Sequence, residues 1–152
     1  MQVLYQIMDF DKSGSAGYLA NHMARLFAHG LHQSIKPLGL APAQFMTLLE
    51  LWASDGLTQK ELVDRLDVEQ ATIANTLARM QRDGLIKRKP HPMDGRSQSI
   101  YLTQKAKDLK PGATMAAAAQ NNLALSGLTE EQKKLFLKYM QTVIRTMKTP
   151  KE

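Results

Sequence analysis

The sequence contains no cysteine in 152 residues. This absence excludes disulfide bonds, thiolate metal sites and thiol-based redox sensing. The sequence also lacks any apolar run close to the ~20 residues that a membrane-spanning helix needs. Residues 1–10 carry no positive charge ahead of their apolar side chains, so they do not resemble a signal peptide. These absences together predict a soluble cytoplasmic protein without a membrane partner.

Signatures of catalysis are missing as well. The sequence has no nucleophile–base motif, phosphate-binding loop or paired catalytic carboxylates, so we predict that the protein is not an enzyme and uses no cofactor. His22, His29 and His32 lie near one face of a predicted helix, and the i,i+3 spacing of the last two would let them share a metal ion. No cysteine or nearby carboxylate completes a tetrahedral site. The alternative, histidines at an interface or in solvent, is the one we adopt, and we predict no metal.

What the sequence does have is an excess of positive charge. The 20 Lys and Arg residues outnumber the 14 Asp and Glu residues, which gives a net charge of +6. Such an excess favours an anionic partner, although it does not distinguish nucleic acid from a membrane surface. The hydrophobic content of 43% and the charged content of 22% are those of a globular chain, and the length is that of about one domain.

Apolar spacing predicts helices on both sides of a central segment. Two helices precede it, from Tyr18 to about Lys36 and from Pro42 to about Ser54, after an irregular arm or short helix in residues 1–17. Two more helices follow it, over 104–126 and 130–147, capped by Thr103 and Thr129. Pro111-Gly112 should kink or split the first of these.

The central segment, residues 57–103, has the element order of a winged helix-turn-helix. Thr58 and Glu61 have capping-box spacing at the start of a short helix, and Asp67-Val68 forms the turn to a second helix that begins near Gln70 and ends at Gly84. Residues 85–89 and 99–102 are predicted to pair as strands around a basic loop. The expected fold is therefore mainly α with a small β-wing: a winged lobe over 41–103 and a helical dimerisation lobe over 1–40 and 104–152.

The helix from Gln70 to Gly84 has an outward face suited to duplex DNA. With Ile73 inward, a rotation of 100° per residue turns Ala71, Asn75, Ala78 and Arg82 outward. Small residues allow a close approach to the major groove, where Asn pairs with adenine and Arg with guanine. The alternative for this helix taken alone is an ordinary solvated amphipathic helix.

The loop between the two strands is the sharper feature. Pro90 and Pro92 stiffen it, Gly95 allows a tight tip, and Arg96 projects from the tip toward a minor groove. Asp94 can hold the guanidinium or a backbone amide. Taken alone, Asp-Gly is equally explained as good turn chemistry. Six Lys or Arg residues against two acids between positions 79 and 96 favour phosphate contacts.

These motifs resemble those of the MarR family of bacterial transcription regulators, with helix order matching over essentially the whole chain. The strongest part is the run from Leu57 to Lys107, with its leucine-rich helix, the GLI-x-R start of the first strand, the Asp-x-Arg wing and the Leu-Thr that ends the second strand. Departures from the family pattern are Ala71, Asn75, Ser97 and Ala106; the first two bear on which bases are contacted.

The resemblance implies a homodimer that binds double-stranded DNA at a palindromic site, as a repressor that responds to an unidentified small molecule (often phenolic in relatives). Residues Gln70 to Arg82 would form the recognition helix, and Asp94 and Arg96 the wing tip. Combined with the residue arguments above, it gives these predicted DNA-binding residues: Thr58, Gln70, Ala71, Thr72, Asn75, Thr76, Arg79, Arg82, Arg88, Lys89, Asp94, Arg96 and Ser97. No ligand-binding residue is predicted. The alternative function is a winged-helix dimer that serves as a protein-interaction module.

Overall fold

The computed structural model describes residues 10–149 and consists of helices around one small sheet. The expectation for an arm or short helix in residues 1–17 is tested only from Phe10 onward, where a 3-10 helix spans Lys12–Gly14. The helices are α1 (Ala16–Ile35), α2 (Pro42–Ala53), α3 (Gln59–Leu66), α4 (Gln70–Arg82), α5 (Gln104–Ala124) and α6 (Glu130–Lys148), with a 3-10 turn at Lys36–Leu38. The strands are β1 (Leu57–Thr58), β2 (Ile86–Pro90) and β3 (Gln98–Leu102). The predicted class, mainly α with a small β-wing, is confirmed.

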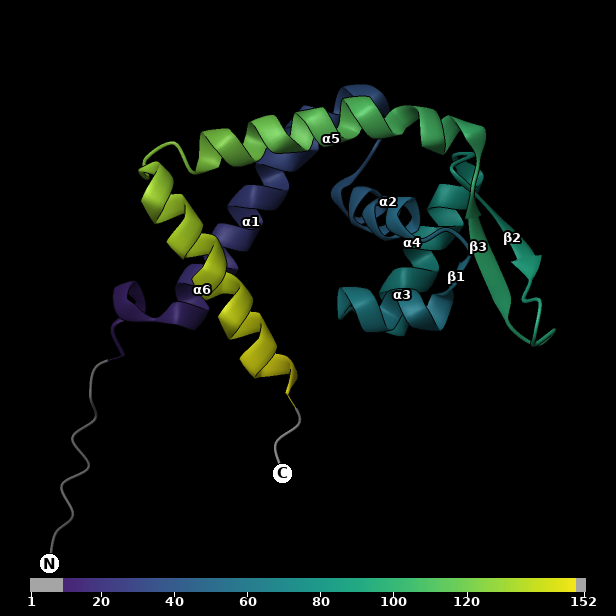
Figure 1. Cartoon of the computed structure of the whole chain (residues 1–152), viewed down its shortest axis with the longest axis horizontal. Helices are drawn as coiled ribbons and strands as arrows, with labels where there is room; N and C mark the ends of the chain where they lie inside the picture. Colours follow the sequence, from purple (N-terminus) through teal and green to yellow (C-terminus); the bar gives the residue numbers. More distant parts are fainter. Residues whose placement is uncertain (1–9, 150–152) are drawn as a thin grey trace, which may run out of the picture.

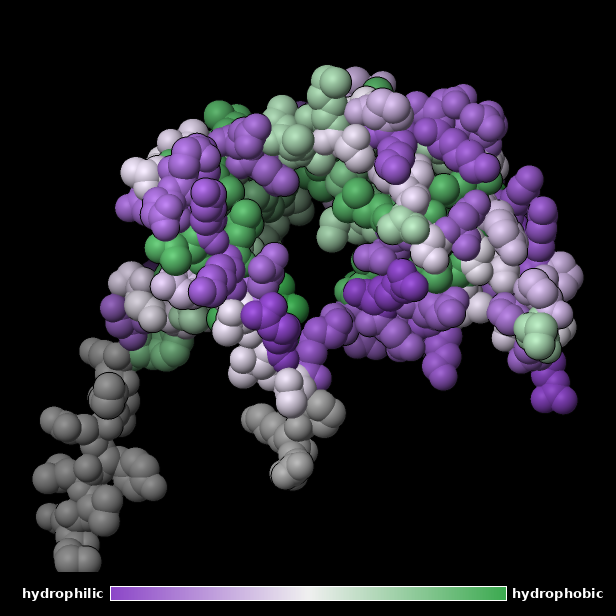
Figure 2. Space-filling model, viewed as in Figure 1, coloured by the Kyte–Doolittle hydropathy of each residue, from purple (hydrophilic) through white to green (hydrophobic). Residues whose placement is uncertain are grey.

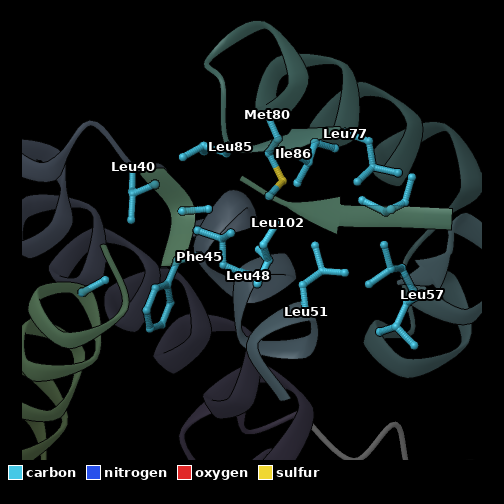
Figure 3. Close-up of a cluster of buried hydrophobic side chains, with 14 of the residues drawn as sticks. Leu40, Phe45, Leu48, Leu51, Leu57, Leu77, Met80, Leu85, Ile86 and Leu102 are labelled. Carbon is cyan, nitrogen blue, oxygen red and sulfur yellow. The ribbon is translucent and has the colours of Figure 1, made fainter. Parts of the chain in front are cut away.

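Long α5 connects two parts of the molecule (Figure 1). At one end of α5 lie α2, α3, α4 and the sheet, and at the other end lie α1 and the descending α6. Helices α1 and α5 pack closely because Gly30 leaves room for the Gln120 amide, with which any Cβ at position 30 would collide. The apolar core lies almost entirely at the α2–α4 end (Figure 3), whereas α6 contributes no buried residue.

The sheet contains one strand more than predicted. Its order is β1-β3-β2, all antiparallel, with Ile86 opposite Leu102 and Leu57 opposite Ile100. The missed strand, β1, is only two residues long and ends at Thr58, which also caps α3: its hydroxyl accepts the Glu61 N–H at 3.2 Å, and the Glu61 carboxylate accepts the Thr58 N–H at 2.7 Å. This backbone hydrogen bond lowers the pKa of Glu61. The predicted capping box is therefore present.

Helix α5 is not split at Pro111, contrary to one of the two expected outcomes. It runs without interruption over Gln104–Ala124, with Pro111 inside it, and Figure 1 shows a single arched ribbon. Pro111 removes the N–H that would bond to the Lys107 carbonyl. Both residues are exposed, so water can take the place of that donor. The Thr114 hydroxyl donates to the Lys110 carbonyl at 2.7 Å one turn further along.

Candidate nucleic-acid interface

Helix α4 presents a small, polar face because its opposite face is anchored in the core. Ile73, Leu77 and Met80 are at most 2% exposed. On the other side, Asn75 and Arg82 are exposed, together with the short side chains of the outward face, Ala71, Thr72 and Ala78. This face carries no acid and no large aliphatic side chain, which allows a close approach to a polyanion.

The turn before α4 depends on a left-handed residue. Asp67 ends α3 at φ 51°, and among the described residues it is the one non-glycine residue with positive φ. Asp tolerates this conformation better than most residues because its short polar side chain can form hydrogen bonds with nearby backbone groups. Just beyond the turn, the Gln59 side-chain amide donates to the Gln70 side-chain oxygen at 3.3 Å, which links the first turns of the two helices.

The other end of α4 is fixed by hydrogen bonds to Asp83. Buried Gln44, on α2, donates to the Asp83 carboxylate at 3.0 Å, and Arg82 Nε donates to its other oxygen at 3.1 Å. Lys105, on α5, donates to the Asp83 backbone carbonyl at 2.8 Å. The Arg82 side chain and then the Gln44 amide hold the pKa of Asp83 below its ordinary value. Helices α2, α4 and α5 therefore meet at this residue.

Thr76, by contrast, belongs to the packed side of α4. It is 8% exposed, and its hydroxyl donates to the Thr72 carbonyl at 2.9 Å. On a helical wheel it lies only about 60° from Ile73, so the 3.6-residue period could have excluded it. We therefore remove Thr76 from the proposed contact surface.

The wing is a two-stranded ribbon with an internally bonded tip. His91 N–H donates to the Ser97 carbonyl at 2.9 Å, and His91 Nδ1 accepts the N–H groups of Met93 and Asp94 at 3.1 and 3.2 Å. The Asp94 carboxylate accepts the Arg96 N–H at 3.0 Å. Of the two partners expected for Asp94, the structure shows the backbone amide.

Gly95 is not conformationally required at this tip. The left-handed glycines in the described range are Gly39, Gly56 and Gly84, and a Cβ at Gly95 would contact nothing within 4 Å. Gly95 is therefore compatible with a tight tip, as predicted, although its backbone conformation does not require a glycine. The internal hydrogen bonds of Asp94 and His91 shape the tip instead.

A polar cleft separates the wing from the start of α3. Its volume is about 350 Å³, and its lining contains four of the predicted residues, Thr58, Arg88, Arg96 and Ser97. Gln59, Lys60 and Gln98 also line it and were missed. Lys60 could have been found from its place in the first turn after Thr58, whereas Gln98 requires knowledge of its pairing with Pro90 in the sheet.

The remaining predicted residues lie on the surface around these features. Arg88 Nε donates to the Gln81 side-chain oxygen at 3.0 Å, which holds the Arg88 guanidinium beside the end of α4. Lys89 Nζ lies 5.1 Å from the centroid of the Tyr101 ring, which holds the Lys89 ammonium over the sheet. Gln70, Thr72, Arg79, Lys89 and Arg96 are exposed. Within residues 10–149 no three His, Asp or Glu side chains gather as a metal site would require.

The fold and this surface define a winged helix-turn-helix protein. A family model described as "MarR family" matches residues 38–97. The chain is 26% identical over 98 residues to the uncharacterized HTH-type transcriptional regulator YybA of Bacillus subtilis (64% of this chain, 65% of YybA). It is 31% identical over 94 residues to the HTH-type transcriptional regulator TtmR of Methylorubrum extorquens (62% of this chain, 47% of TtmR). The matches thus span less than two thirds of these two relatives.

The same likeness holds in three dimensions. The transcriptional repressor CouR, solved bound to a 23-mer DNA duplex, superposes with a TM-score of 0.80 at 25% identity, over 87% of this chain and 94% of CouR. The family model, the sequence relatives and this solved structure thus agree that the chain is similar to MarR-family transcription regulators. These relatives are transcription regulators and not enzymes. No helix in the described part of the chain has the length and hydropathy to cross a bilayer.

Proposed function

We propose that the protein is a sequence-specific regulator of transcription that binds double-stranded DNA. The observation that carries this proposal is the exposed face of α4, small and free of acids, beside a wing that bears Arg96. The relative CouR, a repressor solved on a duplex, supports the same assignment. Action on DNA in a bacterial cell would place the protein in the cytoplasm.

In this mechanism α4 enters the major groove. Asn75 would pair with adenine, and Arg79 and Arg82 would pair with guanine or contact phosphates along the groove wall. Arg96 enters the adjacent minor groove, where the negative potential is strongest when the groove is narrow. Arg88, Lys89 and Lys60 flank the cleft and the ribbon and contact the sugar–phosphate backbone.

The functional unit of the proposal is a homodimer formed by a helical lobe of residues 1–40 and 104–152. Large apolar side chains stay exposed on its helices in the single chain: Leu19 and Leu26 on α1, Met115 and Leu123 on α5, and Leu137, Tyr139, Val143, Ile144 and Met147 on α6. A hollow of about 540 Å³ between α1, the end of α5 and Phe136 adjoins them. A second copy would cover this surface and present two copies of α4 about 10 base pairs apart, as a palindrome requires.

Regulation would follow from two shapes of this dimer. A small molecule that binds one shape more tightly than the other shifts the population toward it, and a shape with the wrong spacing of the two α4 helices releases the operator. We propose the role of a repressor because CouR, to which the chain is similar, is a transcriptional repressor.

A fluorescence-anisotropy titration tests the proposal. The full-length protein is titrated against duplex from its own upstream region and against random duplex, at several salt concentrations. We expect tighter binding to the upstream region and a logarithm of affinity that falls linearly with the logarithm of salt concentration. Equal, salt-insensitive binding to both duplexes would favour a protein-interaction module instead.

A further inference from the structure

The tip of the wing, residues 91–97, has no apolar core to hold its shape. The five residues from Pro92 to Arg96 are all exposed, and Met93 is 89% exposed. Figure 1 places the tip at the end of the ribbon remote from α5, and Figure 2 shows mostly hydrophilic and neutral residues at that edge of the molecule. The shape of the tip therefore depends on hydrogen bonds rather than on apolar burial.

The side chain of His91 supplies two of these hydrogen bonds. Its Nδ1 accepts the N–H of Met93 at 3.1 Å and the N–H of Asp94 at 3.2 Å, two and three positions further along the chain. Asn and Asp side chains form this local pattern in turns with a carboxamide or carboxylate oxygen. The His91 backbone N–H also donates to the Ser97 carbonyl at 2.9 Å, which attaches the ring to the base of the tip. The imidazole thus does the work of an Asn or Asp side chain.

The hydrogen bonds of His91 continue to Arg96 through Asp94. The Asp94 N–H is held by the imidazole, and the Asp94 carboxylate accepts the Arg96 N–H at 3.0 Å. The Asp94 carbonyl accepts the Ser97 N–H at 3.1 Å. Because Asp94 is bonded on both sides, the position of the ring fixes the point from which the Arg96 side chain leaves the backbone.

This arrangement requires one protonation state of the ring. An imidazole nitrogen accepts a hydrogen bond only when it carries no proton, so Nδ1 is bare and the proton of the neutral ring lies on Nε2. In an imidazolium both nitrogens are donors, and Nδ1–H would then face two backbone N–H groups. The ordinary charge change of histidine falls between about pH 5 and 8. Both hydrogen bonds are therefore present with the neutral ring and are lost when acid protonates it.

Charged groups of both signs lie on the elements around His91. The pKa of Glu61, on α3, is lowered mainly by the Thr58 N–H, with a smaller contribution from a charge on His91. Other charged side chains on α3, β2 and the tip are Lys60, Arg65, Arg88, Lys89, Asp94 and Arg96. A proton on His91 adds to the positive charge and so strengthens the general attraction to DNA, while the tip loses its shape. The two effects have opposite signs and need separate measurements.

We propose that His91 is a positioning residue of the wing: its neutral ring, with Nδ1 unprotonated, takes the place of an Asn or Asp side chain and holds the tip in the shape that presents Arg96 to DNA. The presentation of Arg96 rests on the proposed function. The order of the tip is independent of DNA, so the two can fail separately.

Nuclear magnetic resonance of the ¹⁵N-labelled full-length protein without DNA tests the order of the tip. At pH 8 the ring nitrogens of His91 should show the Nε2–H tautomer, and the Met93 and Asp94 amide protons should exchange with water at least tenfold more slowly than in His91→Gln. His91→Asn places an oxygen where Nδ1 lies and should keep this protection at pH 8 and at pH 5.5. The wild type should lose it at pH 5.5, compared with His91→Asn at the same pH.

An Nδ1–H tautomer at pH 8 would overturn the proposal. So would equal amide exchange in the wild type and His91→Gln, or protection in the wild type that survives at pH 5.5 as well as it does in His91→Asn. Circular dichroism checks that the variants are folded, so that a change in exchange is confined to the tip.

Duplex titrations at pH 8, above the ordinary histidine range, test the presentation of Arg96. His91→Gln, whose side-chain oxygen lies one bond too far out, should bind the upstream duplex about fivefold to tenfold more weakly, and His91→Asn should bind it as the wild type does. In the His91→Gln background, Arg96→Ala should have little further effect, because the two residues act as a unit. Equal affinity of His91→Gln and the wild type, equal weakness of both variants, or additive losses would contradict the positioning role. A wild type with an ordered tip that binds no duplex would instead refute the proposed function, and the presentation of Arg96 with it.

Discussion

At the scale of single residues, the hydrogen bond that orders the wing tip leaves the charged group of the tip unpaired by any carboxylate of residues 10–149. The Asp94 carboxylate accepts a hydrogen bond from the Arg96 backbone N–H, and this hydrogen bond orders the tip. Among residues 10–149, no carboxylate lies within ion-pair distance of the Arg96 guanidinium. The positive charge therefore remains available to a phosphate or a base edge.

Truncation of this arginine should weaken DNA binding specifically. We expect Arg96→Ala to cost about 1–3 kcal/mol of operator affinity, because one minor-groove contact is lost, while the dimer remains intact. Anisotropy titrations measure the affinity and sedimentation the assembly. Arg25→Ala, which removes an exposed guanidinium from α1, is the matched control and should have little effect. An unaltered affinity in Arg96→Ala would remove the wing from the mechanism.

The second prediction at this scale concerns Asp83 and pH. Its pKa in the folded protein is lowered, mainly by the Arg82 side chain and then by Gln44. A lowered folded pKa means that the ionised form stabilises the fold above the ordinary value near 3.8, and that this contribution is lost as pH falls through the lowered pKa. The stability difference between wild type and Asp83→Asn should thus be largest near neutral pH and vanish in acid. Denaturant unfolding at several pH values measures it, and a difference independent of pH would contradict the role of the charge.

At the scale of elements, local signals predicted most of the fold. The caps at Thr58, Thr103 and Thr129 were predicted because a cap depends on residues only three positions apart, and all three hydroxyls accept an N3 amide proton. Strand β1 could not be predicted, since two residues carry no period and acquire their pairing only from β3, some 40 positions away. Helix α5 continues through Pro111 although proline is a strong local signal for a helix break. The Lys107 carbonyl that loses its N–H donor belongs to an exposed residue, so water can take the place of that donor.

For the candidate site, the limits of prediction were of the same kind. The outward direction of Asn75 and Arg82 follows from the helical period once Ile73 is set inward. The inclusion of Gln98 in the cleft, by contrast, depends on how the wing folds against α3. No local sequence pattern shows how the wing and α3 pack against each other.

Two glycines allow an element-scale test of backbone conformation. Gly84 lies within the α4–β2 connection at φ 72°, whereas Gly95 does not lie in the left-handed region. Gly84→Ala should lower the free energy of unfolding by about 1–2 kcal/mol, since a Cβ disfavours this conformation. Gly95→Ala is the matched control and should change it by less than about 0.5 kcal/mol. Urea unfolding measures both, and equal effects would refute the conformational argument.

At the scale of the whole molecule, α6 is a helix without a core of its own. Val143 and Ile144 are 56% and 53% exposed in the single chain. Near the end of the helix, Lys148 forms a 2.9 Å ion pair with Asp67 in the α3–α4 turn, but such exposed pairs contribute little. In the proposed dimer, burial of the apolar face against a second copy would be the larger stabilising term.

Sedimentation tests this directly. The wild type should behave as a dimer of about 34 kDa, twice the chain mass of 17.0 kDa, at low micromolar concentration. Ile144→Glu places a charge in the proposed interface and should shift the species toward monomer, with a parallel loss of operator affinity. Lys138→Glu, a charge change at another exposed position of α6, should remain dimeric. A monomeric wild type would contradict the paired arrangement.

The uncovered apolar face of α6 has a consequence for the number of molecules that a cell must make. If pairing precedes DNA binding, the concentration of the competent species falls with the square of the protein concentration once the chains are dilute. Occupancy of the operator would then change steeply with copy number, even without a ligand. A modest change in synthesis or proteolysis of the protein would act on its target genes much as an effector does.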